Sequence, residues 1–195
     1  MKTLSSSFKN MFLVLCTITL IAGFLLAFIY SLTQEKIKLA KEEKGQTAIK
    51  EVLTFSYDNQ PYSQVVNYID EGETLSFYPA FQGTTFQGAA VKSFSKRGYS
   101  GKIWLMIGFD AKGVIQKINV LEHTETPGLG SKMEQPEFQN QFLGKSPESF
   151  RLKVKKDGGD VDAITAATIS SRAFSDAIDR AHKFLLLYKK EKGAQ

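Results

Sequence analysis

The feature that most constrains this chain is an uninterrupted apolar run near its N-terminus. Residues 11–32 contain no charged residue and no Asn, Gln or Pro. An α-helix of about 20 apolar residues is long enough to span the hydrocarbon core of a bilayer. The sequence therefore predicts a transmembrane anchor at 11–32, preceded by a short N-terminal tail at 1–10.

Two other interpretations of this run stay open. Lys2 and Lys9 precede it, as basic residues precede the apolar part of a cleaved signal peptide. That apolar part is usually only about 7–15 residues long, however, and no A-x-A cleavage site follows here. A buried core helix is the second alternative. Bulky residues before Cys16 argue against a lipoprotein signal, so we interpret Cys16 as a small apolar residue of the anchor.

The charges beside the run do not settle its orientation. Four lysines follow it at 36, 38, 41 and 44, and counting alone would place the C-terminal side in the cytoplasm. Long domains, however, translocate largely regardless of charge. Residues 33–195 carry 23 Lys+Arg and 20 Asp+Glu, a net charge of +3. That excess is too small and too dispersed for a nucleic-acid-binding surface, so no nucleic-acid partner is expected.

A helical stalk is predicted directly after the anchor. Residues 34–44 are dense in charge, with Lys38 and Glu42 spaced to pair on one helix face. Gly45 is expected to interrupt this helix, and the apolar residues of 46–55 follow at helical spacing. We expect a juxtamembrane stalk at 33–55 and one globular domain at 56–195.

The domain is predicted to be α+β, with helices packed on an antiparallel sheet. Two β-rich runs, Ile103–Phe109 and Val114–Leu121, flank a short connection that ends in Gly113, which predicts a hairpin. Residues 56–83 are rich in turn formers and predict short strands and loops. A weak helix is expected at 138–143.

The last elements are a predicted strand at 150–154 and a long amphipathic helix. Apolar residues from Phe174 to Tyr188 recur at i, i+3, i+4 and i+7, which predicts about five helical turns starting near Ser170.

Several kinds of site are poorly supported. The chain has one Cys and two His, which excludes a disulfide framework, an all-cysteine zinc site and an iron–sulfur cluster held by this chain alone. There is no G-x-x-x-x-G-K-[ST] phosphate loop and no G-x-S-x-G nucleophile elbow. We therefore expect no metal site and no catalytic residue of these kinds.

Two segments carry the chemistry. Residues 162–171 combine two Thr and two Ser with small Ala residues at the start of the last helix, where hydroxyls, free N–H groups and the helix dipole suit a phosphate. Ordinary N-capping is the alternative. Residues 123–130 form a Pro/Gly-containing loop after a strand, for which a simple strand-end turn is the alternative.

These two segments resemble the signatures of the FMN-binding domain family. The sequence DAITAAT at 162–168 is similar to the family's flavinylation motif, which is Asp, two variable residues, Ser or Thr, Gly, Ala, Thr. The sequence HTETPGLG at 123–130 is similar to its second signature. GYSG at 98–101 and VKKDGG at 154–159 extend the resemblance to roughly 98–174. The chain most resembles the G subunits of Rnf electron-transport complexes, since the homologous C subunits of sodium-pumping NADH:quinone oxidoreductases usually have more sequence between the signatures.

The resemblance implies FMN joined through its phosphate to the hydroxyl of Thr168, a bond made by a separate flavin transferase that uses magnesium and FAD. It also implies a flavin loop, a cation that balances the phosphate or contacts the flavin, and a carboxylate recognised by the transferase. The residues implied to bind the cofactor are Thr168, Thr165, Ala167, Glu125, Thr126, Gly128, Leu129 and Lys155, and Asp162 is implied in transferase recognition. One departure is Ala166, where the family usually has Gly; a positive φ there would strain Ala.

The implied function is electron relay by covalent FMN in a membrane complex that couples ferredoxin oxidation and NAD+ reduction to ion movement. The protein would be an electron carrier with other membrane subunits as partners, and its domain would lie on the extracytoplasmic, periplasmic side of the inner membrane. The C subunit of a sodium-pumping NADH:quinone oxidoreductase, or another respiratory flavoprotein, is one alternative. An unflavinylated, membrane-tethered assembly subunit is another, and Ala166 is the feature that favours it.

Overall fold

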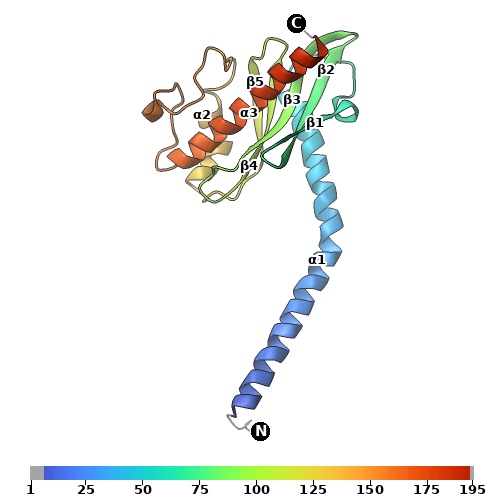
Figure 1. Ribbon diagram of the computed structural model, residues 1–195, viewed down its shortest axis with the longest axis vertical. Coiled ribbons are helices and arrows are strands. Elements are labelled where there is room, and N and C mark those ends of the chain that lie inside the picture. Colours follow the sequence, from blue (N-terminus) through green and yellow to red (C-terminus); the bar gives the residue numbers. More distant parts are fainter. Residues whose placement is uncertain (1–6, 194–195) are drawn as a thin grey trace. The chain divides into compact units, whose positions relative to one another are not determined.

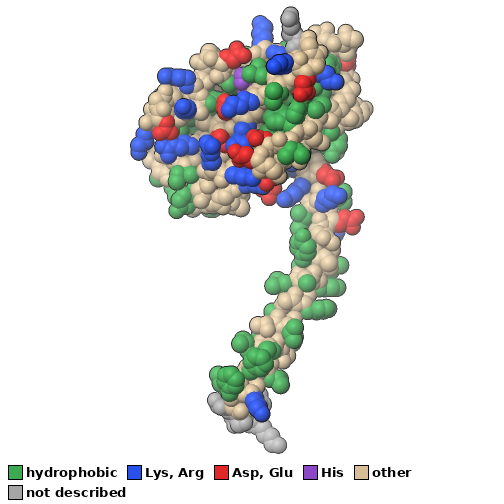
Figure 2. Space-filling view, viewed as in Figure 1, with side chains coloured by type: hydrophobic (Ala, Val, Ile, Leu, Met, Phe, Trp, Pro, Cys, Tyr) green, Lys and Arg blue, Asp and Glu red, His purple; other side chains and the backbone are tan. Residues whose placement is uncertain are grey.

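The computed structural model describes residues 7–193 and begins with one long helix, α1 (Phe8–Val52) (Figure 1). This helix is long and apolar enough to cross a membrane, and the apolar stretch that meets this criterion buries none of its surface. Figure 2 shows hydrophobic side chains exposed along it. A core helix of a soluble protein would bury such a surface, so α1 fits a membrane anchor instead. Of the predicted tail at 1–10, residues 1–6 lie outside the described residues.

Gly45 does not interrupt α1, contrary to expectation. The helix continues to Val52, and a compact unit of the chain begins at Lys44. A glycine inside a helix costs only about 1 kcal/mol relative to alanine. The residues that follow it offset this cost because Ala48, Ile49 and Val52 are buried against the sheet.

The compact unit is built on a five-stranded antiparallel sheet with the strands in sequence order. Its strands are β1 (Val66–Asp70), β2 (Glu73–Gln82), β3 (Thr85–Ser95), β4 (Ile103–Asp110) and β5 (Ile115–Glu122). The predicted β4–β5 hairpin is confirmed, and the N–H of Gly113 donates to the carbonyl of Asp110 at 3.0 Å. Segment 56–83, expected to hold only short strands, contains the ten-residue strand β2.

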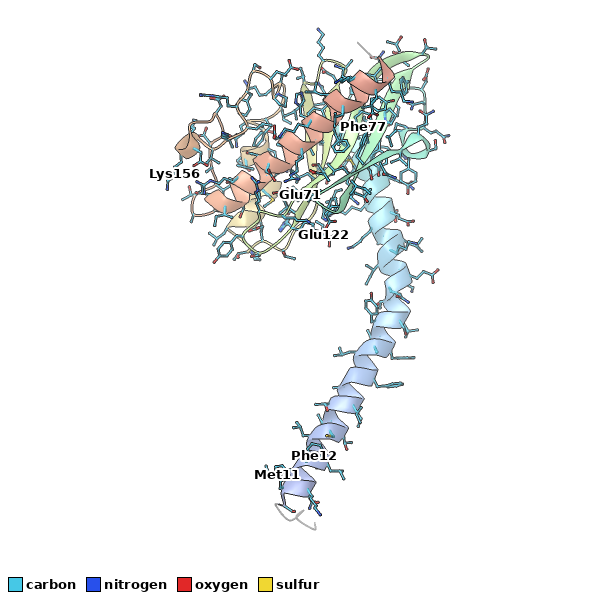
Figure 3. The ribbon with its side chains drawn as sticks, viewed as in Figure 1. Met11, Phe12, Glu71, Phe77, Glu122 and Lys156 are labelled. Atoms are coloured by element: carbon cyan, nitrogen blue, oxygen red, sulfur yellow. The ribbon has the colours of Figure 1, made fainter. Side chains whose placement is uncertain are left out.

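Both faces of the sheet are covered, which explains why its central strands do not simply alternate between apolar and polar residues. Phe77 of β2 (Figure 3) belongs to the core beneath helix α3 (Thr168–Lys192). The centroid of its ring lies 4.2 Å from that of Tyr188. The next residue, Tyr78, belongs to the core formed with the end of α1. The fold is therefore α+β, as predicted, with α3 lying across one face of the sheet (Figure 1).

Helix α3 has the predicted apolar stripe but is longer than expected. It begins at Thr168, two residues before Ser170, and ends at Lys192 with Gly193 in the left-handed region at a φ of 62°. The basic last turn continues the helix because cations are favourable at its C-terminus.

The segment between β5 and α3 is mostly irregular. It contains the 3-10 turn η2 (Gly130–Glu134), the single-turn helix α2 (Pro136–Gln139) and the 3-10 turn η3 (Lys155–Asp157). Another 3-10 turn, η1 (Pro61–Gln64), precedes β1. The predicted strand at 150–154 is wrong: Val154 makes only an isolated parallel bridge with Val161.

Candidate functional site

A pocket with a volume of about 460 Å³ lies at the N-terminus of α3. Three segments that are distant in sequence form it: the turn after β3, the loop after β5 and the first turn of α3. Its lining residues are Tyr99, Glu125, Thr126, Leu129, Gly130, Ala166, Ala167, Thr168, Ile169 and Ser170. This volume lies within the range of small-molecule sites, about 300–1,000 Å³.

The start of α3 places a threonine hydroxyl at this pocket. Thr168 is the first helical residue and is half-buried. The residue before it, Ala167, occupies the N-cap position and provides no side-chain cap. The hydroxyls thus do not cap the helix in the ordinary way, and a negatively charged group near Thr168 would be favoured by the helix dipole.

The two serines that follow are engaged within the protein. The Ser171 hydroxyl accepts from the N–H of Ile164 at 2.9 Å and donates to the carbonyl of Ala167 at 3.0 Å. The Ser170 hydroxyl donates to Oε2 of Glu125 at 2.8 Å. Among the four hydroxyl residues of 162–171, Thr168 and Ser170 line the pocket.

Glu125 holds the three segments of the pocket together. Its side chain is buried, with the residue only 5% exposed. Oε2 accepts from Ser170 of α3, and Oε1 accepts from the backbone N–H of Ser100 at 3.3 Å. The Glu125 N–H donates to Nδ1 of His123 at 3.1 Å. Both oxygens of this buried carboxylate therefore have a hydrogen-bond donor, and removing the side chain would leave the buried Ser170 hydroxyl without its acceptor.

Two glycines make room for this carboxylate. A Cβ on Gly130 would lie 2.5 Å from Oε2 of Glu125 and 2.6 Å from the Ser170 hydroxyl, and a Cβ on Gly98 would lie 2.7 Å from Oε1. Gly128 has a different reason, a φ of 78°, in a conformation that residues with a Cβ rarely adopt. Packing and backbone geometry therefore explain why glycine occupies these positions.

Ala166 has the positive φ that was expected to strain an alanine at this position. Its φ is 61°, and among residues 7–193 only Glu71 is another non-glycine residue with positive φ. The left-handed region costs an L-amino acid about 1–2 kcal/mol. The backbone here has the conformation that a glycine adopts without strain.

The structure brings some of the predicted site residues together and leaves others outside the pocket. Thr168, Ala167, Glu125, Thr126 and Leu129 line it.

Gly128, Thr165, Lys155 and Asp162 are not among its lining residues. The Nζ atom of Lys155 lies 2.7 Å from Oδ1 of Asp162, and both side chains are exposed. Asp162 and Thr165 line a neighbouring, more open groove of about 320 Å³.

The sequence predicted no role at the site for Tyr99 or Ile169, and it indicated Ser170 only as one of the four hydroxyl residues of 162–171. Tyr99 lies within the GYSG segment, which carries part of the family resemblance but no assigned role. Ile169 and Ser170 directly follow the motif, so the signal for them was their position in the first turn of the helix. Within residues 7–193, no group of three or more His, Cys, Asp or Glu side chains is placed to hold a metal ion.

Comparisons with known proteins agree with this architecture. The family model of the FMN-binding domain matches residues 98–183, which include all three segments of the pocket. The G subunit of the ion-translocating oxidoreductase complex of Aliivibrio fischeri is 30% identical over 197 aligned residues, covering 95% of this chain and 94% of that protein. The protein of the same description from Methanosarcina acetivorans is 34% identical over 181 residues, covering 91% and 94%.

Among solved structures, the crystal structure of Shewanella oneidensis NqrC aligns with a TM-score of 0.44 and 18% identity, over 63% of this chain and 67% of that one. The identity and coverage of the two G-subunit relatives establish the relationship without it. This chain belongs to the family of G subunits of ion-translocating oxidoreductase complexes and carries an FMN-binding domain.

Proposed function

We propose that this protein is a membrane-anchored electron-relay subunit of an Rnf-type complex and that its FMN is bound covalently to Thr168. The observation that carries the proposal is the place of Thr168, which is the first residue of α3, lines the pocket and ends the flavinylation-like motif at 162–168. The relatives' description as subunits of a complex supports the assignment to a membrane complex.

The residues of the pocket fit the two parts of FMN. A phosphate on Thr168 would lie at the positive end of the α3 dipole, near the backbone N–H groups of the first turn. The exposed side chains of Leu129 and Ile169 offer apolar contact for the flavin ring. A pocket that is mostly apolar and has a few convergent polar groups is the usual form of a cofactor site.

The attachment requires a co-substrate and an enzyme. In our proposal the Thr168 hydroxyl oxygen forms a bond to the FMN-side phosphorus of FAD. The bond between that phosphorus and the bridging oxygen breaks, AMP leaves with that oxygen, and the hydroxyl proton passes to solvent. A flavin transferase with magnesium would catalyse this step. The exposed Asp162 is our candidate for the carboxylate that the transferase recognises.

Bound FMN would supply the electron transfer, and the protein would supply attachment, orientation and a restricted environment. Glu125 orients the pocket rather than acting as an acid or base, because both its oxygens accept hydrogen bonds from the protein. Lys155 would neutralise Asp162, or the phosphate if the lysine turns toward the pocket. The relay would pass electrons between other membrane subunits, with this domain on the extracytoplasmic side.

A second candidate, an unflavinylated assembly subunit, is favoured by one observation, the methyl group of Ala166, which is exposed and lines the same pocket as Thr168. If the transferase must approach the backbone closely at this position, the methyl group would obstruct it. This candidate keeps the membrane anchor and the fold but removes the cofactor.

Coexpression with a flavin transferase, followed by intact-mass measurement and in-gel flavin fluorescence, tests both candidates. The wild-type protein should gain the mass of one FMN less one water and fluoresce under ultraviolet light. Thr168→Ala should abolish both signals, while the control Thr84→Ala, at an exposed threonine outside the motif, should retain them. A wild-type chain that stays unmodified, alongside an Ala166→Gly variant that is modified, would favour the second candidate.

A further inference from the structure

Three exposed apolar side chains gather around the pocket at the start of α3. Tyr99 is 71% exposed, Leu129 is 42% exposed and Ile169 is 45% exposed, and all three line the same pocket. They come from the turn after β3, the loop after β5 and the first turn of α3. Such a convergence of apolar groups around a concave site marks a binding surface rather than scattered surface residues.

The turn that presents Tyr99 is held at several points. Ser100 donates its backbone N–H to Oε1 of Glu125, and its carbonyl accepts from the Thr124 hydroxyl at 2.8 Å. Gly98 packs directly against Glu125 and against the carbonyl of Gly101, where a Cβ would not fit. The turn is thereby tied to the loop that lines the pocket.

Glu125 also ties this turn to the other side of the pocket, because its second oxygen accepts from Ser170 of α3. The exposed ring of Tyr99 is therefore presented by a backbone whose position relative to the start of α3 is fixed. An aromatic side chain in such a place brings a large contact surface at a small cost in conformational entropy.

We infer that Tyr99 is a cofactor-contacting residue whose aromatic ring packs against the isoalloxazine ring of the bound flavin. The inference rests on the proposed function, since it requires FMN at Thr168. Planar aromatic groups favour stacked or edge-to-face contact, and the isoalloxazine ring is a planar aromatic system. Leu129 and Ile169 complete the apolar surround, so the flavin covers side chains that are otherwise exposed.

This contact has a spectroscopic consequence that is independent of electron-transfer activity. A tyrosine in contact with a flavin quenches flavin fluorescence by donating an electron to the excited ring. The ring of phenylalanine is a much weaker donor. Tyr99→Phe therefore keeps the shape of the contact and removes most of the quenching, and Tyr99→Leu removes both.

The test uses the full-length protein, coexpressed with the transferase and purified in detergent, with flavin loading measured by intact mass. Fluorescence yield and lifetime per attached flavin are recorded for the folded protein and again after unfolding in guanidinium. Tyr62→Leu is the matched control, because Tyr62 is also exposed but lines a different pocket. Folded Tyr99→Phe and Tyr99→Leu should fluoresce several-fold more than wild type, and Tyr62→Leu should match wild type. After unfolding, all four proteins should agree.

Two failures are distinguishable. If the wild-type protein carries no flavin by mass, the proposed function falls and this inference falls with it. If flavin is attached but folded Tyr99→Phe and Tyr99→Leu fluoresce like wild type, only the inference is overturned, and the apolar rim is then available to a protein partner. Tyr99→Phe keeps the test valid even if Tyr99→Leu does not fold.

Discussion

Ala166 is the residue at which sequence and backbone disagree most clearly. Its φ of 61° suits glycine, whereas an alanine in this region is strained by about 1–2 kcal/mol. A glycine would relieve this strain, but its greater conformational entropy in the unfolded state would offset part of the gain in stability. We predict that Ala166→Gly raises the free energy of unfolding by about 0.5–1 kcal/mol, measured by urea denaturation.

Gly158 provides the matched control for Ala166. It has a φ of 78°, and a Cβ placed on it would meet no atom within 4 Å. Gly158→Ala should therefore destabilise the protein through backbone strain alone. A loss of stability in Ala166→Gly, or a gain in Gly158→Ala, would contradict this account of the backbone.

The sequence could predict those residues of the pocket that are contiguous in the chain. Thr168 and Ala167, which both line the pocket, could be predicted because they lie in one short motif before a helix. The bond from Ser170 to Glu125 joins residues 45 positions apart, and no local pattern encodes such a contact. Tyr99 was missed for the same reason, since its place at the pocket depends on how the turn after β3 packs against Glu125.

At the scale of elements, local patterns predicted regular structure well where they were long. The β4–β5 hairpin and the stripe of α3 followed from period and turn residues. Local sequence patterns gave wrong predictions where tertiary contacts determine the secondary structure. Gly45 was expected to interrupt a helix that packing continues to Val52. The segment 150–154, which alternates apolar and basic residues and was predicted to be a strand, makes only one isolated bridge.

The packing of the end of α1 on the sheet depends on a glycine in β4. A Cβ on Gly108 would collide with the carbonyl of Val52 and lie 3.0 Å from the Val52 Cβ. We predict that Gly108→Ala lowers the free energy of unfolding by roughly 1–3 kcal/mol, the usual cost of overpacking. Gly45→Ala is the control, because its Cβ would meet nothing within 4 Å, and it should be neutral or slightly stabilising. Equal effects of the two changes in urea denaturation would refute this role of Gly108.

Helix α3 also contains a group that makes stability depend on pH. Burial lowers the pKa of His182 below 6.5, although Glu148 and Asp179 partly oppose the shift, and its Nε2 has no hydrogen-bond partner among residues 7–193. The folded state therefore favours the neutral ring. This contribution is fully present above the unfolded pKa of 6.5 and is lost as pH falls through the folded pKa. We predict that His182→Leu reduces the loss of stability between neutral and mildly acidic pH, measured as urea midpoints. An unchanged loss would assign the acid sensitivity to other groups.

For the whole molecule, the sequence contains two populations of hydrophobic residues. One forms the exposed apolar surface of α1, and the other forms the cores on the two faces of the sheet. Cys16, the only cysteine, lies in the first population. The compact unit that starts at Lys44 thus has no thiol of its own, and in our proposal FMN supplies its redox chemistry.

The lone cysteine makes the orientation of the domain testable. Thr84 is exposed in the turn between β2 and β3. We predict that a membrane-impermeant maleimide labels Thr84→Cys in intact cells with a permeable outer layer, since the proposed location is extracytoplasmic. The unsubstituted protein is the control, and its Cys16 in the anchor should stay unlabelled. Labelling of Thr84→Cys only after the inner membrane is broken would place the domain in the cytoplasm.

The central claim is that one flavin is attached to one hydroxyl, and a fragment spectrum tests it most directly. Trypsin cleavage after Lys156 and Arg172 gives a peptide that contains Thr165, Thr168, Ser170 and Ser171. Tandem mass spectrometry of this peptide from coexpressed protein should place the mass of FMN less water on Thr168. An unmodified peptide, or a modification on any of the other three hydroxyls, would contradict the account.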